Sequence, residues 1–299
     1  MVIVAVVSMQ VKAWVWIGAI YLGAIKTVLA CGLSKRSATL ALMLSAFLTK
    51  FSVRAQKVAF YSHDRVDFEV ATDTRARDIQ VVPEPFPYII VDDFFKPHIY
   101  HSLCIQFDEV KRRGLLEEPW SPDRFHRFNM DYDGYVYTPP PTLNRADPMS
   151  IFFSLEWNWF FSKIFRQFTG FETVVAFHHH PSGNRTGFVH HDNVDKRFSP
   201  LRRLANGVMY GEGAASDPVV AHRKIALLYF LGNDEWQEGD GGETGLYSAD
   251  GKALVKKVAP INNRLLAFQI SPISMHAFQE NLKERNSIVQ WFHVPPELA

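Results

Sequence analysis

The sequence predicts a mainly β (α+β) domain with a β-sandwich or jelly-roll arrangement. After Gly170, short runs of β-branched and aromatic residues alternate with Gly, Asn, Asp and Pro. Many short strands at such spacing are typical of a sandwich or jelly roll rather than of alternating βα units. Two apolar stripes at helical spacing precede these runs, and they predict helices that buttress one outer face of the strands.

The first elements follow a change of composition at residues 83–87, where alternating prolines hold the chain extended. A strand is expected at 88–91, followed by a helix that begins at Pro97 and ends at Gly114. A second helix is expected over 154–168, with Gly170 as its C-terminal glycine. The strands expected after it are 173–177, 187–191, 225–231, 244–248, 254–258, 264–270 and 285–292.

The chain divides into an N-terminal hydrophobic segment and linker (1–82) and a domain over 83–299. A membrane helix needs about 20 apolar residues. The run from 13 to 33 reaches that length only by including Lys26, which costs about 2.5–3.5 kcal/mol on insertion. Two interpretations of residues 1–50 stay open: membrane association, or sequence that is poorly ordered or precedes the true start. We expect a cytoplasmic protein, with a membrane-anchored one as the alternative.

Composition excludes some classes of function. Acidic and basic residues nearly cancel at net +1, so no global field draws the chain to nucleic acid, and no nucleic-acid partner is indicated. Two cysteines make neither a zinc cluster nor a disulfide framework.

A candidate metal site begins at His190 and Asp192. Residues two apart on a strand point to the same side, so these two side chains share a face and His191 points away. A neutral imidazole and a carboxylate make half of a site for a divalent metal. His276, in another strand-like segment, is the candidate third ligand. Two histidines and a carboxylate suit the non-haem Fe(II) oxygenases, but zinc hydrolases also use this set.

Arg285 and Ser287 help to choose between these metals. Both lie on one face of the final strand by alternation. An inward arginine is costly unless it meets an anion, and its planar fork suits a carboxylate beside which a serine can donate a hydrogen bond. The alternative is that Arg285 lies on the solvent face of the strand and pairs with Glu284.

At this point the sequence resembles the iron and 2-oxoglutarate-dependent dioxygenases, in particular their prolyl 4-hydroxylase-like branch. The resemblance runs from about Pro83 to the C-terminus. Five ordered segments carry it: the opening strand (86–94), the first metal-ligand segment (183–193), the central strand (223–231), the Gly-Gly-Glu hairpin (241–247) and the strand before the distal histidine (263–268). The short step from His276 to Arg285 is also usual in that family.

The resemblance implies a double-stranded β-helix, which is a jelly roll. It implies that His190, Asp192 and His276 hold Fe(II), and that Arg285, with Ser287, holds the distal carboxylate of 2-oxoglutarate. The implied reaction uses dioxygen, releases succinate and CO2, and hydroxylates a prolyl or related residue in a peptide or protein. Ascorbate often keeps such iron reduced. The same chemistry on a small metabolite, and a non-catalytic metal-binding interaction module, are the alternatives.

Four departures from the family pattern carry expectations of their own. The prolyl hydroxylases often have lysine where Arg285 stands, and Tyr-Leu-Asn where this chain has 230–232, so Tyr229 is expected to face away from the site. His178-His179-His180 replaces an aromatic residue; it is either a second metal site or, as alternation favours, part of the pocket wall. The insertion 196–222 is expected to contact substrate.

Overall fold

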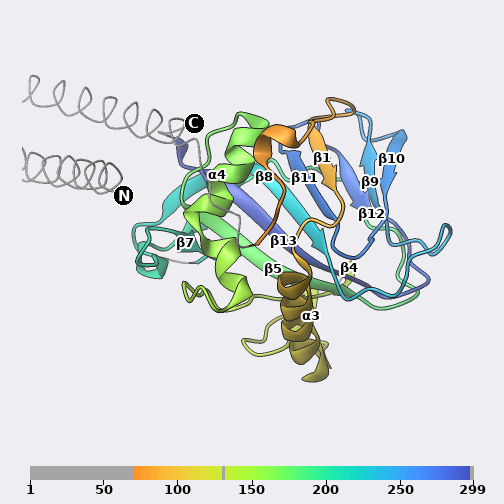
Figure 1. The fold of residues 1–299 in the computed structure, drawn as a ribbon, viewed down its shortest axis with the longest axis horizontal. Coiled ribbons are helices and arrows are strands. Elements are labelled where there is room, and N and C mark those ends of the chain that lie inside the picture. The colour runs from red at the N-terminus through yellow and green to blue at the C-terminus, as the bar shows by residue number, and fades with distance from the viewer. Residues whose placement is uncertain (1–70, 130–131, 214, 297–299) are drawn as a thin grey trace, which may run out of the picture. The chain divides into compact units, whose positions relative to one another are not determined.

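The computed structural model describes residues 71–296, apart from 130, 131 and 214. Two antiparallel-rich sheets and a few helices make up this part of the chain (Figure 1). The helical elements are η1 (Ala76–Asp78), α3 (Pro97–Arg112), η2 (Pro148–Phe153), α4 (Leu155–Phe165) and η3 (Pro200–Arg202). The strands are β1 (Tyr88–Val91), β2 (Leu115–Leu116), β3 (Phe125–Asn129), β4 (Tyr132–Tyr137), β5 (Glu172–His180), β6 (Asp195–Phe198), β7 (Met209–Tyr210), β8 (Val219–Phe230), β9 (Thr244–Tyr247), β10 (Leu254–Val258), β11 (Leu265–Gln269), β12 (His276–Phe278) and β13 (Arg285–Val294).

The larger sheet has the order β1-β11-β8-β13-β5-β4-β3-β2, with β6 paired to β8 and β7 paired to β5. The smaller sheet has the order β10-β9-β12. Neighbouring strands in the larger sheet come from distant parts of the chain, as where β13 lies between β5 and β8. The double-sheet arrangement confirms the mainly β prediction.

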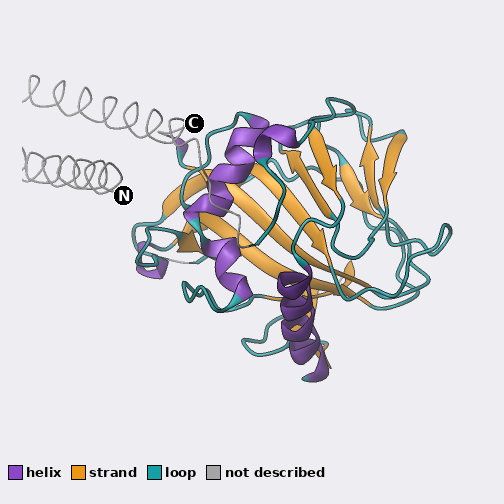
Figure 2. Cartoon of the chain, viewed as in Figure 1, coloured by secondary structure: helices purple, strands orange, loops and turns teal. Residues whose placement is uncertain are grey.

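Both α-helices cover the same outer face of the larger sheet (Figure 2). Their apolar stripes produce this packing: Leu103 and Phe107 of α3, and Trp157 and Phe161 of α4, are fully buried. Trp157 stacks on Phe95 and donates a hydrogen bond from Nε1 to Oε1 of Gln290 in β13, at 2.6 Å. The helices therefore pack on the outer face of β13, and Arg285 lies on the inner face of the same strand.

Alternation along β8 divides its side chains between two cores. Ile225, Leu227 and Tyr229 face the helices. Ala226, Leu228 and Phe230 face the smaller sheet and pack with residues such as Leu246 and Phe268. Tyr229 therefore points away from the inner face, as predicted, and its hydroxyl donates to Oδ1 of Asn263 at 2.8 Å.

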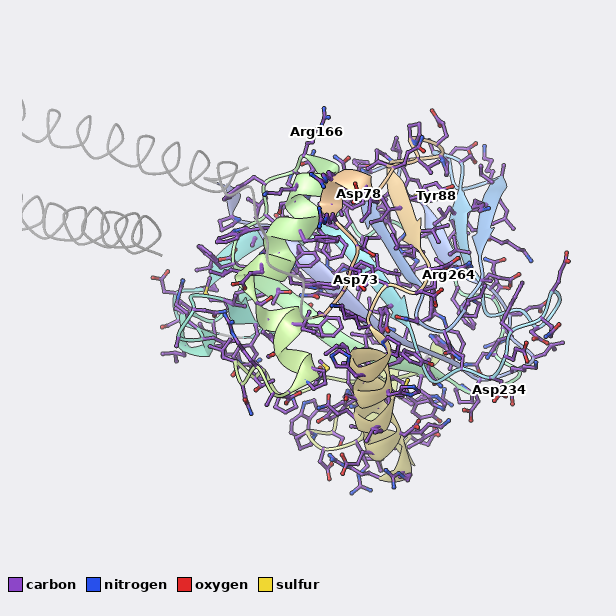
Figure 3. All side chains as sticks on the ribbon, viewed as in Figure 1. Asp73, Asp78, Tyr88, Arg166, Asp234 and Arg264 are labelled. Atoms are coloured by element: carbon purple, nitrogen blue, oxygen red, sulfur yellow. The ribbon has the colours of Figure 1, made fainter. Side chains whose placement is uncertain are left out.

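The second helix ends earlier than predicted. It begins after Ser154, whose side chain accepts a hydrogen bond from the Trp157 N–H, but it ends at Arg166 in the left-handed conformation, with φ 52° (Figure 3). Gly170 has a different role, because a Cβ there would lie 2.8 Å from Cδ of Pro295 and collide with the Glu172 carboxylate. Close packing, rather than a helix cap, requires this glycine.

One other prediction about an element was wrong. Residues 187–191 do not form a strand; only His190 makes an isolated bridge, to His276. The insertion 196–222 adds short strands to the larger sheet, since β6 pairs with the first residues of β8 and β7 pairs with β5. Strands β2, β3 and β4 were not predicted, because their sequence shows no sustained alternation.

The N-terminal predictions fall largely outside the described residues. The segment proposed to associate with a membrane, 1–50, lies wholly outside them, and the division at residue 83 stays a prediction. Residues 71–82 pack on the domain: the Thr72 hydroxyl donates to the Phe94 carbonyl, and Ala71 belongs to the helix-side core. In the part of the chain that the structure describes, no helix is both long enough and apolar enough to cross a membrane.

The buried position of Trp157 predicts a large loss of stability when the indole is removed. Trp157→Ala leaves a cavity and takes the donor from Gln290, so the free energy of unfolding should fall by about 3–5 kcal/mol. Urea denaturation measures this. Trp120→Ala is the matched control, because Trp120 is 72% exposed and its loss should change stability by no more than about 0.5 kcal/mol. Equal effects of the two changes would contradict this account of the core.

Candidate metal centre

Three side chains that are distant in sequence come together on the inner side of the larger sheet. His190 and Asp192 lie in the extended segment after β5, and His276 begins β12. Each offers one ligand atom, and these atoms all lie within 4.8 Å of one another. Backbone hydrogen bonds in both directions hold the two histidines together, from His190 N to His276 O at 3.0 Å and from His276 N to His190 O at 2.8 Å. The side chains of His190 and Asp192 therefore share one side of their segment, as predicted, although this segment is not a strand.

Each histidine is oriented by its own backbone. Nδ1 of His190 lies 2.9 Å from the Phe188 carbonyl, and Nδ1 of His276 lies 3.0 Å from the Ser274 carbonyl. A carbonyl only accepts, so Nδ1 carries the proton and Nε2 keeps its lone pair. Burial lowers the pKa of His276, and the nearby Asp192 carboxylate opposes this effect only in part. The net lowering of the pKa keeps this imidazole neutral. Metal-binding histidines are typically held in this way.

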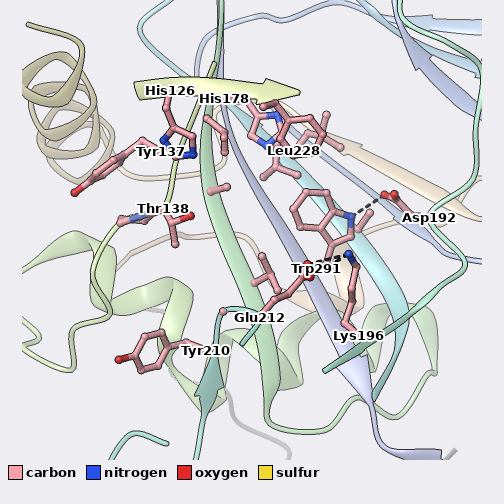
Figure 4. A pocket seen from close by; sticks show the side chains of 18 of the residues that line it. His126, Tyr137, Thr138, His178, Asp192, Lys196, Tyr210, Glu212, Leu228 and Trp291 are labelled. Atoms are coloured by element: carbon pink, nitrogen blue, oxygen red, sulfur yellow. Dashed lines mark hydrogen bonds and ion pairs between the residues drawn. The ribbon is translucent and has the colours of Figure 1, made fainter. Parts of the chain in front are cut away.

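The Asp192 carboxylate is buried and fully hydrogen-bonded. Oδ1 accepts from Nη1 of Arg223 at 2.9 Å. Oδ2 accepts from Nε1 of Trp291 at 2.7 Å (Figure 4). Burial alone would raise the pKa of Asp192, but the nearby His276, the Arg223 guanidinium and the Trp291 N–H together hold it below its ordinary value. The group is thus an anion at neutral pH, as a metal ligand must be.

Arg285 lies inward, with only 3% of its surface exposed. Its Nη2 donates to Oγ1 of Thr244 at 3.2 Å, and its guanidinium lies 5.0 Å from the centre of the Phe230 ring. Glu284 pairs instead with Lys111, so the surface alternative for Arg285 was wrong. Ser287 lies on the same strand and is fully buried, and its Oγ has no hydrogen-bond partner among the described residues.

One pocket of about 920 Å³ joins the three clustered ligands to Arg285. Strands β5, β8 and β13 form its floor through alternate residues, including Ala176, Leu228 and Val289. The insertion contributes Lys196 and Glu212, which form an ion pair at 3.0 Å at one end of the pocket (Figure 4). The insertion thus reaches the pocket from strand β6 and from the loop before β8, and its contact with substrate stays a prediction.

The triple histidine is divided by strand alternation. His178 lines the pocket, whereas His179 lies on the opposite face and hydrogen-bonds through Nδ1 to Oδ1 of Asn286 at 2.7 Å. His180 stacks on Phe278, with ring centroids 4.2 Å apart. Burial, with the Arg285 guanidinium, lowers the pKa of His178 to about 3, so it is neutral at physiological pH. These positions match the pocket-wall interpretation rather than a second metal site.

Two residues of the site were not singled out from sequence. Arg223 meets Asp192, and Thr244 meets Arg285. Thr244 could have been found, because it follows the Gly-Gly-Glu residues within the predicted hairpin, 241–247. Arg223 could not, because strict alternation along β8 places it with Ile225 on the helix side, away from the pocket.

The geometry defines a class of protein: a double-sheet β domain with a histidine and carboxylate centre and a buried arginine in one pocket. Comparison with known families agrees with it. The model of the 2OG-Fe(II) oxygenase superfamily matches residues 175–293, which include the three clustered residues and Arg285. Residues 175–293 are therefore similar to this superfamily, whose name gives Fe(II) and 2-oxoglutarate as metal and cosubstrate, and the three clustered residues fit such a metal.

Curated relatives match over a shorter region. The chain is 34% identical over 84 residues to prolyl 3-hydroxylase OGFOD1 of Xenopus laevis, and 36% identical over 86 residues to that of Mus musculus. Each match covers 26% of this chain and 16% of the relative.

Solved structures give weaker likenesses. A prolyl-4-hydroxylase of Pseudomonas putida has a TM-score of 0.49 at 15% identity, covering 69% of this chain and 92% of its own. A prolyl hydroxylase of Trichoplax adhaerens, solved with a hypoxia inducible factor peptide, has a TM-score of 0.49 at 17% identity, covering 71% and 85%.

Proposed function

We propose that residues 83–299 form an Fe(II)- and 2-oxoglutarate-dependent dioxygenase that hydroxylates a prolyl or related residue in a peptide or protein. His190, Asp192 and His276 bind the iron. Arg285 binds the distal carboxylate of 2-oxoglutarate, and Ser287 adds a hydrogen bond beside it. When bound, the iron and 2-oxoglutarate supply oxidation of a substrate C–H bond by dioxygen, with release of succinate and CO2.

The observation that carries this proposal is the shared pocket. Two imidazoles with free Nε2 lone pairs and one anionic carboxylate are the ligand set of the non-haem Fe(II) oxygenases, which leaves positions open for cosubstrate and oxygen. A zinc hydrolase has no need of a buried guanidinium across the same pocket. Arg285 supplies the fork that a carboxylate requires, and its burial makes that interaction strong.

The mouth of the pocket favours a peptide over a small metabolite. Trp120, Phe128 and Phe188 line it and are 72%, 51% and 63% exposed. Large exposed aromatic side chains that line a pocket are typical of a surface that binds another polypeptide. The curated relatives are named prolyl 3-hydroxylases, which supports a prolyl residue as the target.

Loading with Fe(II) tests the chemistry directly. The anaerobic full-length protein with Fe(II) and 2-oxoglutarate should develop a visible charge-transfer band, and it should form succinate when oxygen is admitted. Proline-containing peptides should increase succinate formation, and their mass should rise by one oxygen atom. Absence of both the band and succinate would exclude the oxygenase, whereas succinate stimulated only by small metabolites would exclude the peptide substrate.

The two adjacent histidines make a matched pair for testing the metal ligands. His190→Ala should weaken Fe(II) binding by more than about 100-fold, because loss of an outer-shell partner alone costs about 10–100-fold. His191→Ala should leave it unchanged, since His191 is exposed and lies outside the clustered ligand atoms. Titration of the metal-free protein with Fe(II) measures both. Equal losses would count against the assignment of His190.

Arg285→Ala should separate cosubstrate binding from metal binding. Loss of the charged hydrogen bonds should weaken 2-oxoglutarate binding by about 10- to 100-fold and leave Fe(II) affinity nearly intact. Anaerobic titration of the iron-loaded variant, followed by the charge-transfer band, measures the first quantity. Unchanged 2-oxoglutarate affinity would show that the distal carboxylate binds elsewhere.

A further inference from the structure

Arg223 has no role in the proposed reaction, yet it is held at the centre of the site. Its side chain is 10% exposed, and its guanidinium lies 4.3 Å from the centre of the Trp291 ring. Nη1 donates to Oδ1 of Asp192 at 2.9 Å, and Nη2 lies 3.9 Å from Oε1 of Glu212. A cation placed this close to a metal site repels the metal, so its presence there calls for a compensating function.

The two oxygens of Asp192 are in different surroundings. Oδ2 is the oxygen near His276, at 3.7 Å from its Nε2, and it also accepts from Trp291. Oδ1 is occupied by the Arg223 guanidinium. Only Oδ2 therefore faces the space between the imidazoles, where a metal would lie.

We propose that Arg223 is a positioning residue that holds Oδ1 of Asp192 and so restricts this carboxylate to one-oxygen binding of the metal. This inference rests on the proposed function. A carboxylate that binds through both oxygens takes a second coordination position, which would be lost to 2-oxoglutarate or oxygen. Arg223 keeps that position open, and Trp291 steadies the oxygen that remains.

A β-bulge in β8 brings Arg223 to Asp192. Ile225 pairs with Phe292, and Arg223 pairs with His293, so one extra residue on β8 makes a bulge at Lys224. Without the bulge Arg223 would share the helix side with Ile225; with it, the side chain turns into the pocket. Glu212, itself paired with Lys196, approaches the guanidinium from the far side.

Arg223→Met removes the donor and the charge, and Arg223→Lys keeps the charge and one donor. We expect Arg223→Met to bind Co(II) about 10- to 100-fold more weakly and to change its visible d–d spectrum. Arg223→Lys should recover much of the affinity and the wild-type spectrum. Trp291→Phe, which removes the donor to Oδ2 but keeps a ring under Arg223, should also weaken binding and serves as the second variant if Arg223→Met does not fold.

Arg202→Met is the matched control, because Arg202 also lines the pocket but donates to the Glu212 carbonyl rather than to Asp192. Its Co(II) affinity and spectrum should match the wild type. Wild-type affinity and spectrum in Arg223→Met and Trp291→Phe, or an equal change in Arg202→Met, would overturn the inference. Failure of the wild-type protein to bind Co(II) or Fe(II) would instead overturn the proposed function.

Discussion

A single buried carboxylate sets the conditions that the rest of the site must meet. An ionised carboxylate taken out of water is costly unless its oxygens are partnered. Asp192 obtains its partners from two strands, Arg223 of β8 and Trp291 of β13, which are adjacent only because β13 lies between β5 and β8. The sheet order, the bulge at Lys224 and the path of the segment after β5 all serve this one interaction.

The same strands connect stability to the site. On β13, Gln290 faces the helices and holds Trp157, whereas Arg285 and Trp291 face the pocket. On β8, Tyr229 belongs to the helix-side core and Phe230 lies beside the Arg285 guanidinium. Because alternate residues of one strand serve the two faces, packing of α3 and α4 limits how far the pocket-side groups can move. The site is thus built on a rigid sheet rather than on loops alone.

Local pattern was a good guide where one periodicity dominated. The strands β1 and β10 and the start of α3 have the predicted bounds, since alternation, proline and apolar spacing act within a few residues. It failed where a long-range partner decided the structure. Residues 187–191 have strand-like sequence, but only His190 among them makes a β-bridge. The insertion 196–222 gains strands because β8 and β5 offer free edges to it.

The sequence by itself determined the classes of side chain and their pairing by short spacing: His190 with Asp192, Arg285 with Ser287, and Tyr229 turned from Phe230. These follow from backbone geometry that any extended segment shares. Only the tertiary structure decided that His276 bridges His190, that Thr244 meets Arg285, and that Arg223 turns inward to Asp192. Such contacts depend on strand order and on a bulge, and neither is recorded in the local pattern of the residues concerned.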